Sequence, residues 1–237
     1  IKQRMSSVFR YAIQTARREV NPAGELRGVV ATKKTEHLAA LPAAALPVFL
    51  KKLEHYSGQA VTKLALKLLM LTFVRPGELR AARWSEFDTE GRLWRIPGER
   101  MKMKEEHLVP LSGQALAVLE ELRPLTGKYD LLFPATTNVR KPMSENTLTY
   151  AIRRRLGFNA TAHGMRALAS TVLNEAGFNT DVIERQLAHA ERNKIRAAYN
   201  RSQYLDQRRE MMTWWADYLD AQRADQKVVP IGRARAS

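Results

Sequence analysis

Apolar residues recur every three or four positions along most of the chain, which is the spacing of amphipathic helices. This pattern predicts helices over residues 2–20, 42–58, 59–74, 78–83, 112–122, 144–156, 164–176, 181–187, 194–200 and 206–223. The segment 59–74 is apolar on most of its sides, so we expect it to run through the core. Ser112 precedes the helix over 112–122 as a plausible N-cap, because its hydroxyl can accept a hydrogen bond from the first turn.

Strand-like patterns are few along the chain. The convincing candidates are residues 93–96, 106–111 and 131–133, which are too few for a parallel α/β sheet. The sequence therefore predicts a mainly α fold with a small antiparallel β-sheet inserted after Arg83.

The amphipathic helix over 2–20 stands apart from the rest of the pattern. One such helix cannot bury its own apolar stripe, and the residues 24–37 that follow have the mixed composition of a linker. We therefore expect three parts: a helix and linker over 1–35, a main domain over 36–223 and a flexible tail over 224–237. Because the chain begins at Ile1 without an initiator Met, we expect that further sequence precedes it.

Composition and charge limit the class of protein. Apolar residues make up 45% of the chain and charged residues 27%, as in soluble globular proteins. The 39 lysines and arginines outnumber the 24 acidic residues and leave a net charge of +15, so nucleic acid is the expected partner. The absence of cysteine excludes disulfides and thiolate chemistry and favours the cytoplasm. No run of about 18 apolar residues is present that could span a bilayer.

Six polar residues in the last two thirds of the chain could together break a phosphodiester without a metal. They are Arg75, Lys102, His163, Arg166, His189 and Tyr199. Two arginine forks suit the non-bridging oxygens, a lysine can give a proton to the departing oxygen, and a tyrosine hydroxyl can attack. His163 and Arg166 lie three residues apart, which places both on one face at the start of a helix, where an anion is favoured.

Each of these residues has an ordinary structural explanation when taken alone, such as a solvated arginine or a capping histidine. Two positions also have rivals nearby, because Lys104 is as basic as Lys102 and Tyr204 follows Tyr199 by five residues. Ionising a tyrosine with a pKa near 10 costs about 4 kcal/mol at pH 7, which surrounding cations or a base must offset. The hypothesis therefore depends on all six residue types occurring together in the order that this chemistry requires.

The order and spacing of these residues resemble the tyrosine recombinases, in particular the phage and genomic-island integrases. The most specific segments are Leu71-Thr-Phe-Val-Arg-Pro-Gly-Glu-Leu-Arg, Ala162-His-Gly-Met-Arg, Leu187-Ala-His-Ala-Glu, and Lys102 placed eight residues before Pro110. The resemblance implies phosphate binding by Arg75 and Arg166, protonation of the leaving group by Lys102, acid–base work by His163, support of the phosphate by His189 and a 3′-phosphotyrosyl link at Tyr199. It also implies that Glu78 braces the site. Many members place the tyrosine nine residues after the second histidine, whereas Tyr199 comes ten after His189.

The resemblance implies a function as well as a site. It implies a bacterial, nucleoid-associated, site-specific recombinase that cuts and rejoins duplex DNA and integrates or excises a prophage or genomic island. The implied partners are double-stranded DNA attachment sites, a homotetramer formed on DNA, a directionality factor and a host DNA-bending protein, with no membrane. No metal or other cofactor is implied. Residues 1–35 resemble the C-terminal helix and linker of a truncated core-binding domain.

Three rival functions remain open at the level of sequence. A type IB topoisomerase shares the Arg, Lys, Arg, His and Tyr set, although His163 favours a recombinase because those topoisomerases usually carry Lys there. A basic DNA-binding module without catalysis would not need all six residues. A two-metal nuclease would need an acidic cluster, and the candidates Glu86, Asp88 and Glu90 are expected to form a solvated turn.

Overall fold

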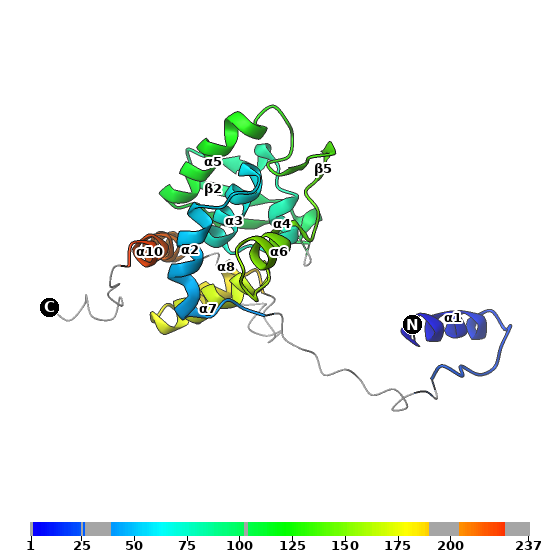
Figure 1. Cartoon of the computed structure of the whole chain (residues 1–237). Coiled ribbons are helices and arrows are strands. Elements are labelled where there is room, and N and C mark those ends of the chain that lie inside the picture. The colour runs from blue at the N-terminus through cyan, green and yellow to red at the C-terminus, as the bar shows by residue number, and fades with distance from the viewer. Residues whose placement is uncertain (1, 25, 27–38, 102–103, 190–203, 226–237) are drawn as a thin grey trace. The chain divides into compact units, whose positions relative to one another are not determined.

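The computed structural model describes residues 2–24, 26, 39–101, 104–189 and 204–225, and the chain forms two compact units, Ile1–His37 and Leu38–Ser237. The first unit contains helix α1 (Lys2–Gln14), which is shorter than the predicted helix (Figure 1). The turn after α1 is held by a hydrogen bond of 2.8 Å from the Asn21 amide to the Ser6 hydroxyl. The apolar side chains of Met5, Val8 and Tyr11 are exposed.

The second unit is built mainly from helices, as the sequence predicts. They are α2 (Leu46–Glu54), α3 (Ala60–Thr72), α4 (Pro76–Arg80), α5 (Gly113–Thr126), α6 (Thr147–Tyr150), α7 (Gly164–Glu175), α8 (Thr180–Gln186) and α10 (Leu205–Arg223). A π-helical turn, Ala151–Arg155, continues α6, and short 3-10 turns occur at Ala43–Ala45, Trp84–Glu86 and Gly98–Arg100. The predicted helix over 194–200 lies outside the described residues.

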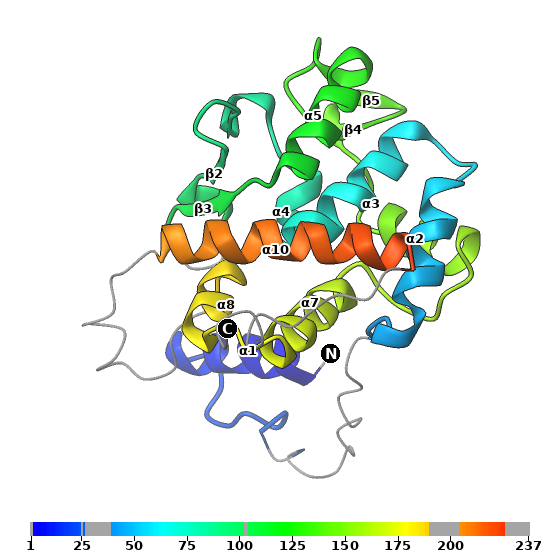
Figure 2. The same ribbon diagram turned by 90° about the vertical axis from the view of Figure 1, so that its left-hand side faces the viewer.

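Helix α3 lies at the centre of this unit, and helix α10 packs along one side of it. Helix α3 is buried on most of its sides, which confirms that the segment runs through the core. Helix α10 lies across the unit and packs against α2, α3, α5, α8 and the third strand of the sheet (Figure 2). Its Trp215 is 0% exposed and donates a hydrogen bond of 2.7 Å to the carbonyl of Met70 in α3. The last helix therefore packs on the core of its own chain.

The strands form two small antiparallel sheets. One has the order β1 (Phe87–Asp88), β2 (Leu93–Ile96), β3 (His107–Pro110), and the other pairs β4 (Pro134–Ala135) with β5 (Asn138–Pro142). In the first sheet Phe87 pairs with Trp94, and Ile96 pairs with His107. The predicted mainly α fold with a small antiparallel sheet inserted after Arg83 is confirmed.

Two local predictions were wrong. Residues 131–133 do not form a strand. All three are buried in the core, and their strand-like pairing is limited to an isolated bridge between Leu131 and Arg83. Strand β5 was missed because its residues are exposed and carry no apolar alternation. Glu86 is not solvated: it is 8% exposed, and it accepts hydrogen bonds of 2.9 Å from the Trp94 indole and 2.6 Å from Arg100.

Candidate active site

Arg75 stands where the buried helix α3 gives way to the short helix α4. Helix α3 ends in Phe73, whose φ of 38° turns the chain, and Pro76 begins α4 directly after Arg75. Glu78 holds Arg75 by two hydrogen bonds. Its carboxylate accepts one of 2.9 Å from the Arg75 backbone N–H and one of 2.8 Å from Nη1 of Arg75. Glu78 is 6% exposed, so this ion pair is shielded from water on the carboxylate side. The Arg75 guanidinium is therefore fixed by its own helix.

Arg166 is the third residue of α7 and is 4% exposed. Its Nη1 donates to the carbonyl of Phe73 at 2.7 Å and its Nη2 to the carbonyl of Leu187 at 2.6 Å. Burial, followed by the positive charge of Arg75, lowers the pKa of Arg166 to about 10. The guanidinium still carries its charge at neutral pH.

The C-terminal end of α8 supplies the acceptors for both arginines. The chain leaves α8 through a Schellman turn, in which the N–H of Ala188 donates to the Arg185 carbonyl and the N–H of His189 to the Glu184 carbonyl, both at 3.1 Å. Ala188 occupies the left-handed position of this turn with φ 49°. The Ala188 carbonyl accepts a hydrogen bond of 2.8 Å from Nη2 of Arg75. It directly follows the Leu187 carbonyl, which accepts a hydrogen bond from Arg166.

His189 is oriented by a carboxylate and an arginine. Its Nδ1 lies 2.7 Å from Oε2 of Glu184, and its Nε2 lies 3.4 Å from Nη2 of Arg166. In the neutral ring this geometry fits a proton on Nδ1, which donates to the carboxylate, and a lone pair on Nε2 that faces the guanidinium. Glu184 and His189 are the two ends of the Schellman turn, so the turn itself brings them together.

His163 lies at the N-terminus of α7 with its ring accessible to solvent. Partial burial lowers the pKa of His163, and the positive charges of Arg166, Arg75 and His189 lower it further. The imidazole is therefore neutral at neutral pH and can accept a proton. Arg75 and His163 line the same hollow, Arg75 and Arg166 donate to the consecutive carbonyls of Ala188 and Leu187, and His189 lies 3.4 Å from Arg166. The four side chains therefore converge from three separate stretches of sequence.

A hollow of about 550 Å³ opens beside these side chains. Its lining includes Arg75, Glu78, Arg100, Met101 and His163. The predicted site residues Lys102 and Tyr199 lie outside the described residues. Met101 directly precedes Lys102, so the described chain reaches the hollow one residue before it.

Lys104 and Tyr204, the alternatives to Lys102 and Tyr199, both lie among the residues that the structure describes. Lys104 is exposed, and Tyr204 is half-buried against the core at the start of α10. Neither observation decides between the rivals.

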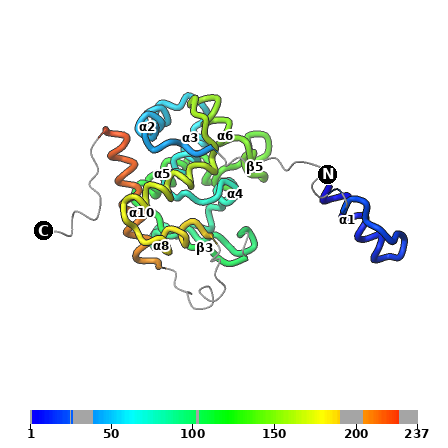
Figure 3. The backbone as a smooth tube through the Cα atoms, turned by 90° about the horizontal axis from the view of Figure 1, so that it is seen from below, coloured from blue at the N-terminus to red at the C-terminus, as the bar shows by residue number. Residues whose placement is uncertain are grey.

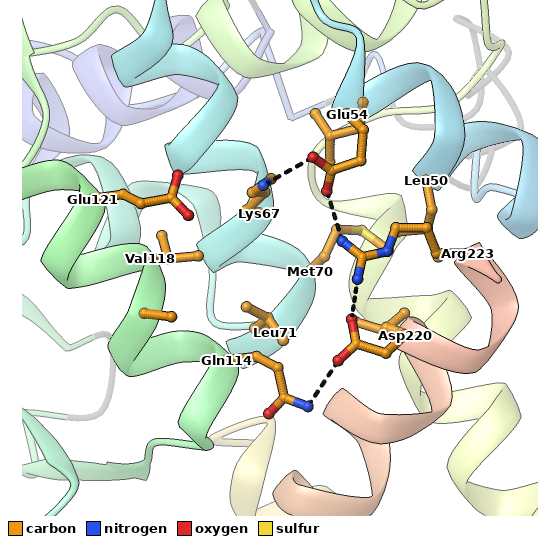
Figure 4. A pocket seen from close by; sticks show the side chains of 13 residues that line it. Leu50, Glu54, Lys67, Met70, Leu71, Gln114, Val118, Glu121, Asp220 and Arg223 are labelled. Carbon is orange, nitrogen blue, oxygen red and sulfur yellow. Dashed lines mark hydrogen bonds and ion pairs between the residues drawn. The ribbon is translucent and has the colours of Figure 1, made fainter.

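A second hollow, of about 220 Å³, lies between α2, α3, α5 and α10 (Figure 4). Its charged groups face one another: Glu54 pairs with Lys67 and Arg223, and Asp220 pairs with Arg223 and accepts from Gln114. Because these charges neutralise each other over an apolar floor, this hollow is a poor site for an anion.

The described part of the chain holds no group of three or more His, Cys, Asp or Glu residues that could bind a metal ion. Among these same residues no helix has the length and apolar character needed to cross a membrane.

Sequence reasoning missed several groups that shape the site. Glu184 carries a weak signal, namely its place five residues before His189 at the end of a predicted helix. The carbonyls of Leu187 and Ala188 carry none, because every residue type has a backbone oxygen. His107 and Gln186, whose carbonyl lies 3.2 Å from the His107 ring, could not be distinguished from surface polar residues.

Comparison with known proteins gives the relatives of this chain. Residues 40–205 match the sequence profile of the Phage integrase family. The integrase of Enterobacteria phage P4 is 46% identical over 94% of this chain and 55% of that protein, and the integrase of Shigella phage Sf6 is 39% identical over 92% and 57%. The chain thus spans little more than half the length of these relatives.

Solved structures show the same fold at lower identity. A lambda integrase (75–356) dimer bound to a COC′ core site has a TM-score of 0.60 at 20% identity and covers 80% of this chain and 70% of that chain. A lambda integrase tetramer bound to a Holliday junction has a TM-score of 0.60 at 19% identity, with 81% and 58% covered. The chain therefore belongs to the phage integrase family of tyrosine recombinases.

Proposed function

We propose that this chain is the catalytic part of a site-specific DNA recombinase, which integrates or excises a prophage or genomic island through a covalent 3′-phosphotyrosine intermediate. The observation that carries the proposal is geometric: Arg75 and His163 line one hollow, Arg166 is held beside Arg75 at the end of α8, and His189 lies 3.4 Å from Arg166. Two permanent cations and two imidazoles in that space suit a phosphodiester, whose negative charge increases as it is attacked.

The phosphate would bind between the two arginines. Contacts with the described residues use one N–H on Nη1 and one on Nη2 of Arg75, and a guanidinium has five N–H groups in all. The remaining N–H groups can donate to non-bridging oxygens without breaking the contacts that aim the side chain. Because the arginines are already held, little reorganisation is needed when DNA arrives.

The covalent step would then proceed without a cofactor. The hydroxyl oxygen of Tyr199 bonds to phosphorus while the bond from phosphorus to the 5′-oxygen breaks. The tyrosine proton passes to a base, for which neutral His163 is suited, and the departing 5′-oxygen takes a proton from the ammonium of Lys102. Attack by a 5′-hydroxyl on the phosphotyrosine reverses these steps and joins a new strand.

The test is a trapping experiment with nicked DNA. The substrate is a pool of duplexes whose sequence around the nick is randomised and whose scissile strand is labelled at its 5′ end. Cleavage releases a short 5′-hydroxyl fragment, so the label remains on the protein through denaturing electrophoresis. We expect Tyr199→Phe to abolish the adduct and to keep DNA binding, and Tyr204→Phe, the matched control, to retain it. Loss of the adduct in Tyr204→Phe alone would assign the nucleophile to Tyr204.

Sequencing the trapped DNA would give a defined site for the second test. A supercoiled plasmid carrying two copies of that site should lose the intervening DNA to the recombinase. A type IB topoisomerase would instead relax the plasmid and leave both sites in place. Adduct formation should persist in excess EDTA, and a strict requirement for magnesium would point to a metal-dependent nuclease.

The partners belong to the same proposal. The net charge of +15 supports binding to double-stranded attachment-site DNA. The lambda integrase structures with this fold contain a dimer on a core site and a tetramer on a Holliday junction, which supports a homotetramer on DNA. A directionality factor and a host DNA-bending protein would act on the complete protein, of which unit Ile1–His37 would be the end of a core-binding domain.

A further inference from the structure

Helices α10 and α8 and strand β3 meet on one side of the second unit (Figure 3). Three polar side chains are buried there. Arg208 in α10 and Gln186 in α8 are 0% exposed, and His107 in β3 is 4% exposed. A buried guanidinium loses the water that stabilises its charge, so protein acceptors must replace that water. Burial, followed by the nearby charge of Arg185, lowers the pKa of Arg208 to about 9. Arg208 therefore remains a cation at neutral pH.

Arg208 joins three elements with one side chain. Its Nε and Nη2 donate to Oε1 of Gln186 at 3.0 and 2.7 Å, which fastens α10 to α8. Its Nη2 also donates to the backbone carbonyl of Leu108, which fastens α10 to β3. The direction of approach is fixed as well as the contact, because the guanidinium is planar and its N–H groups point outward in one plane.

Gln186 extends the contacts from α8 to the end of α3 and to β3. Its Nε2 donates to the carbonyl of Thr72 at 3.2 Å, and its own backbone carbonyl lies 3.2 Å from Nε2 of His107. Thr72 is followed by Phe73, whose carbonyl holds Arg166. The buried contacts thus reach the backbone that aims the phosphate-binding arginines.

The network also lies close in sequence to the proposed catalytic residues. The separations are three residues from Thr72 to Arg75, three from Gln186 to His189, six from Lys102 to Leu108 and nine from Tyr199 to Arg208. Segment 190–203, which contains Tyr199, connects α8 to α10. The contact between Arg208 and Gln186 therefore joins the two helices between which that segment runs.

Stability alone is a poor explanation for these residues. Replacing a buried charged group and its partner by apolar residues of similar volume is often neutral or stabilising, because the desolvation of the charge is avoided. What an apolar pair cannot supply is directed hydrogen bonding, which allows one arrangement of α10, α8 and β3 and excludes slightly shifted ones.

From this geometry, and given the proposed function, we infer that Arg208 is a positioning residue for the nucleophile. Through Gln186 and the Leu108 carbonyl it fixes the start of α10, the helix that follows Tyr199 in the sequence, relative to the end of α8 that holds Arg75 and Arg166. Its effect is on the rate of the covalent step and not on the affinity for DNA, because it does not face the phosphate.

The test separates positioning from stability with four variants. Arg208→Met removes the hydrogen bonds, and Arg208→Lys keeps the charge with a different geometry. The double variant Arg208→Met with Gln186→Leu replaces the buried polar pair by apolar side chains and should regain the thermal midpoint lost in the single variant. Arg209→Met is the matched control, because Arg209 is the neighbouring arginine and its guanidinium donates to the Gly91 carbonyl at 3.0 Å.

The measurement is the single-turnover rate of adduct formation on the trapped nicked DNA, beside the dissociation constant for the same DNA. We expect Arg208→Met to react about 100-fold more slowly, since a displacement of about 1 Å has that effect on a positioned reaction, and to bind DNA within about twofold of wild type. Arg208→Lys should be intermediate, and Arg209→Met close to wild type. The double variant should regain stability but remain slow; a double variant with the wild-type rate would overturn the inference.

A sulfur substitution distinguishes the nucleophile from the general acid. With sulfur in place of the bridging 5′-oxygen, the leaving group departs as a thiolate and needs no proton. If Arg208 positions Tyr199, the variants should remain slow on this substrate. Full recovery on the sulfur substrate would instead place the effect on the strand that follows Lys102, and would overturn the assignment to the nucleophile.

The wild-type chain provides the last comparison. If it forms no adduct that depends on Tyr199, the proposed function fails and this inference fails with it. If the adduct forms and the double variant reacts normally, only the role of Arg208 is refuted.

Discussion

Acidification from pH 8 to pH 4.5 should destabilise the second unit by about 3 kcal/mol through one buried ring, that of His107. The His107 side chain is 4% exposed, and its Nε2 lies 3.2 Å from the carbonyl of Gln186, so the neutral ring donates from Nε2. Burial lowers the pKa of His107 to about 3, and the positive charges of Arg208, Arg185 and Arg166 act in the same direction.

The sign follows from proton binding in the two states. In the unfolded chain a histidine has a pKa near 6.5, so between pH 6.5 and pH 3 the unfolded state binds a proton that the folded state does not. Stability is therefore fully present above pH 6.5 and is lost as the pH falls toward 3. Each pH unit in this window changes the free energy of unfolding by about 1.4 kcal/mol, which gives about 3 kcal/mol at pH 4.5.

The assay is urea unfolding at several pH values, with wild type compared with His107→Gln. Glutamine keeps an N–H donor near the position of Nε2 but does not titrate, so its curve should lack the part of the pH dependence that comes from His107. Taking the difference between the two proteins cancels the contributions of other groups and of the net charge. The control is His55→Gln, which removes an exposed histidine of the same unit. Parallel curves for wild type and His107→Gln would refute the reasoning.

Three further predictions concern the site and the core. Ala188→Gly should stabilise the protein by up to about 1 kcal/mol in urea unfolding, because glycine avoids the cost of φ 49°; a loss of stability would contradict this. Glu184→Ala should slow adduct formation about tenfold, whereas Glu184→Gln keeps an acceptor for Nδ1 of His189 and should retain most of the rate; equal losses would show that this hydrogen bond is not what matters. Ser112→Ala should cost about 1 kcal/mol, measured by unfolding, because the hydroxyl accepts 3.2 Å from the Ala115 N–H; an unchanged midpoint would exclude this cap.

Most of the fold follows from local patterns in the sequence. Helix α3 could be predicted because its buried sides are written as a continuous apolar run, and α5 because Ser112 caps it. Strand β2 coincides with the prediction, since Leu93, Trp94 and Ile96 are buried. The same reasoning failed for residues 131–133 and for strand β5. An apolar run normally indicates a strand, but residues 131–133 are buried without forming one. Strand β5 is paired although its residues are exposed and polar, so no apolar pattern marks it.

The candidate site was only partly accessible from sequence. Arg75, His163, Arg166 and His189 could be proposed because their residue types suit a phosphate and their order is that of the family. Glu78, which holds Arg75, could be proposed from the resemblance as well. The burial of Glu86 and Arg208 could not be predicted, because both are charged residues that a sequence pattern places on the surface. What decides burial is the long-range contact of Glu86 with Arg100 and of Arg208 with Gln186, and no local pattern contains it.

The carbonyl oxygens of Leu187 and Ala188 orient the two arginines, and single amino-acid substitutions at these positions do not remove a backbone oxygen. Any residue at 187 or 188 presents the same oxygen, so a scan that exchanges side chains one at a time would score these positions by their packing and overlook their grip on the guanidinium groups. An insertion or deletion of one residue between 184 and 189 is different, because it rotates the turn and redirects both cations at once. Tolerance to substitution combined with intolerance to a change of length would be the signature of such a backbone-held site.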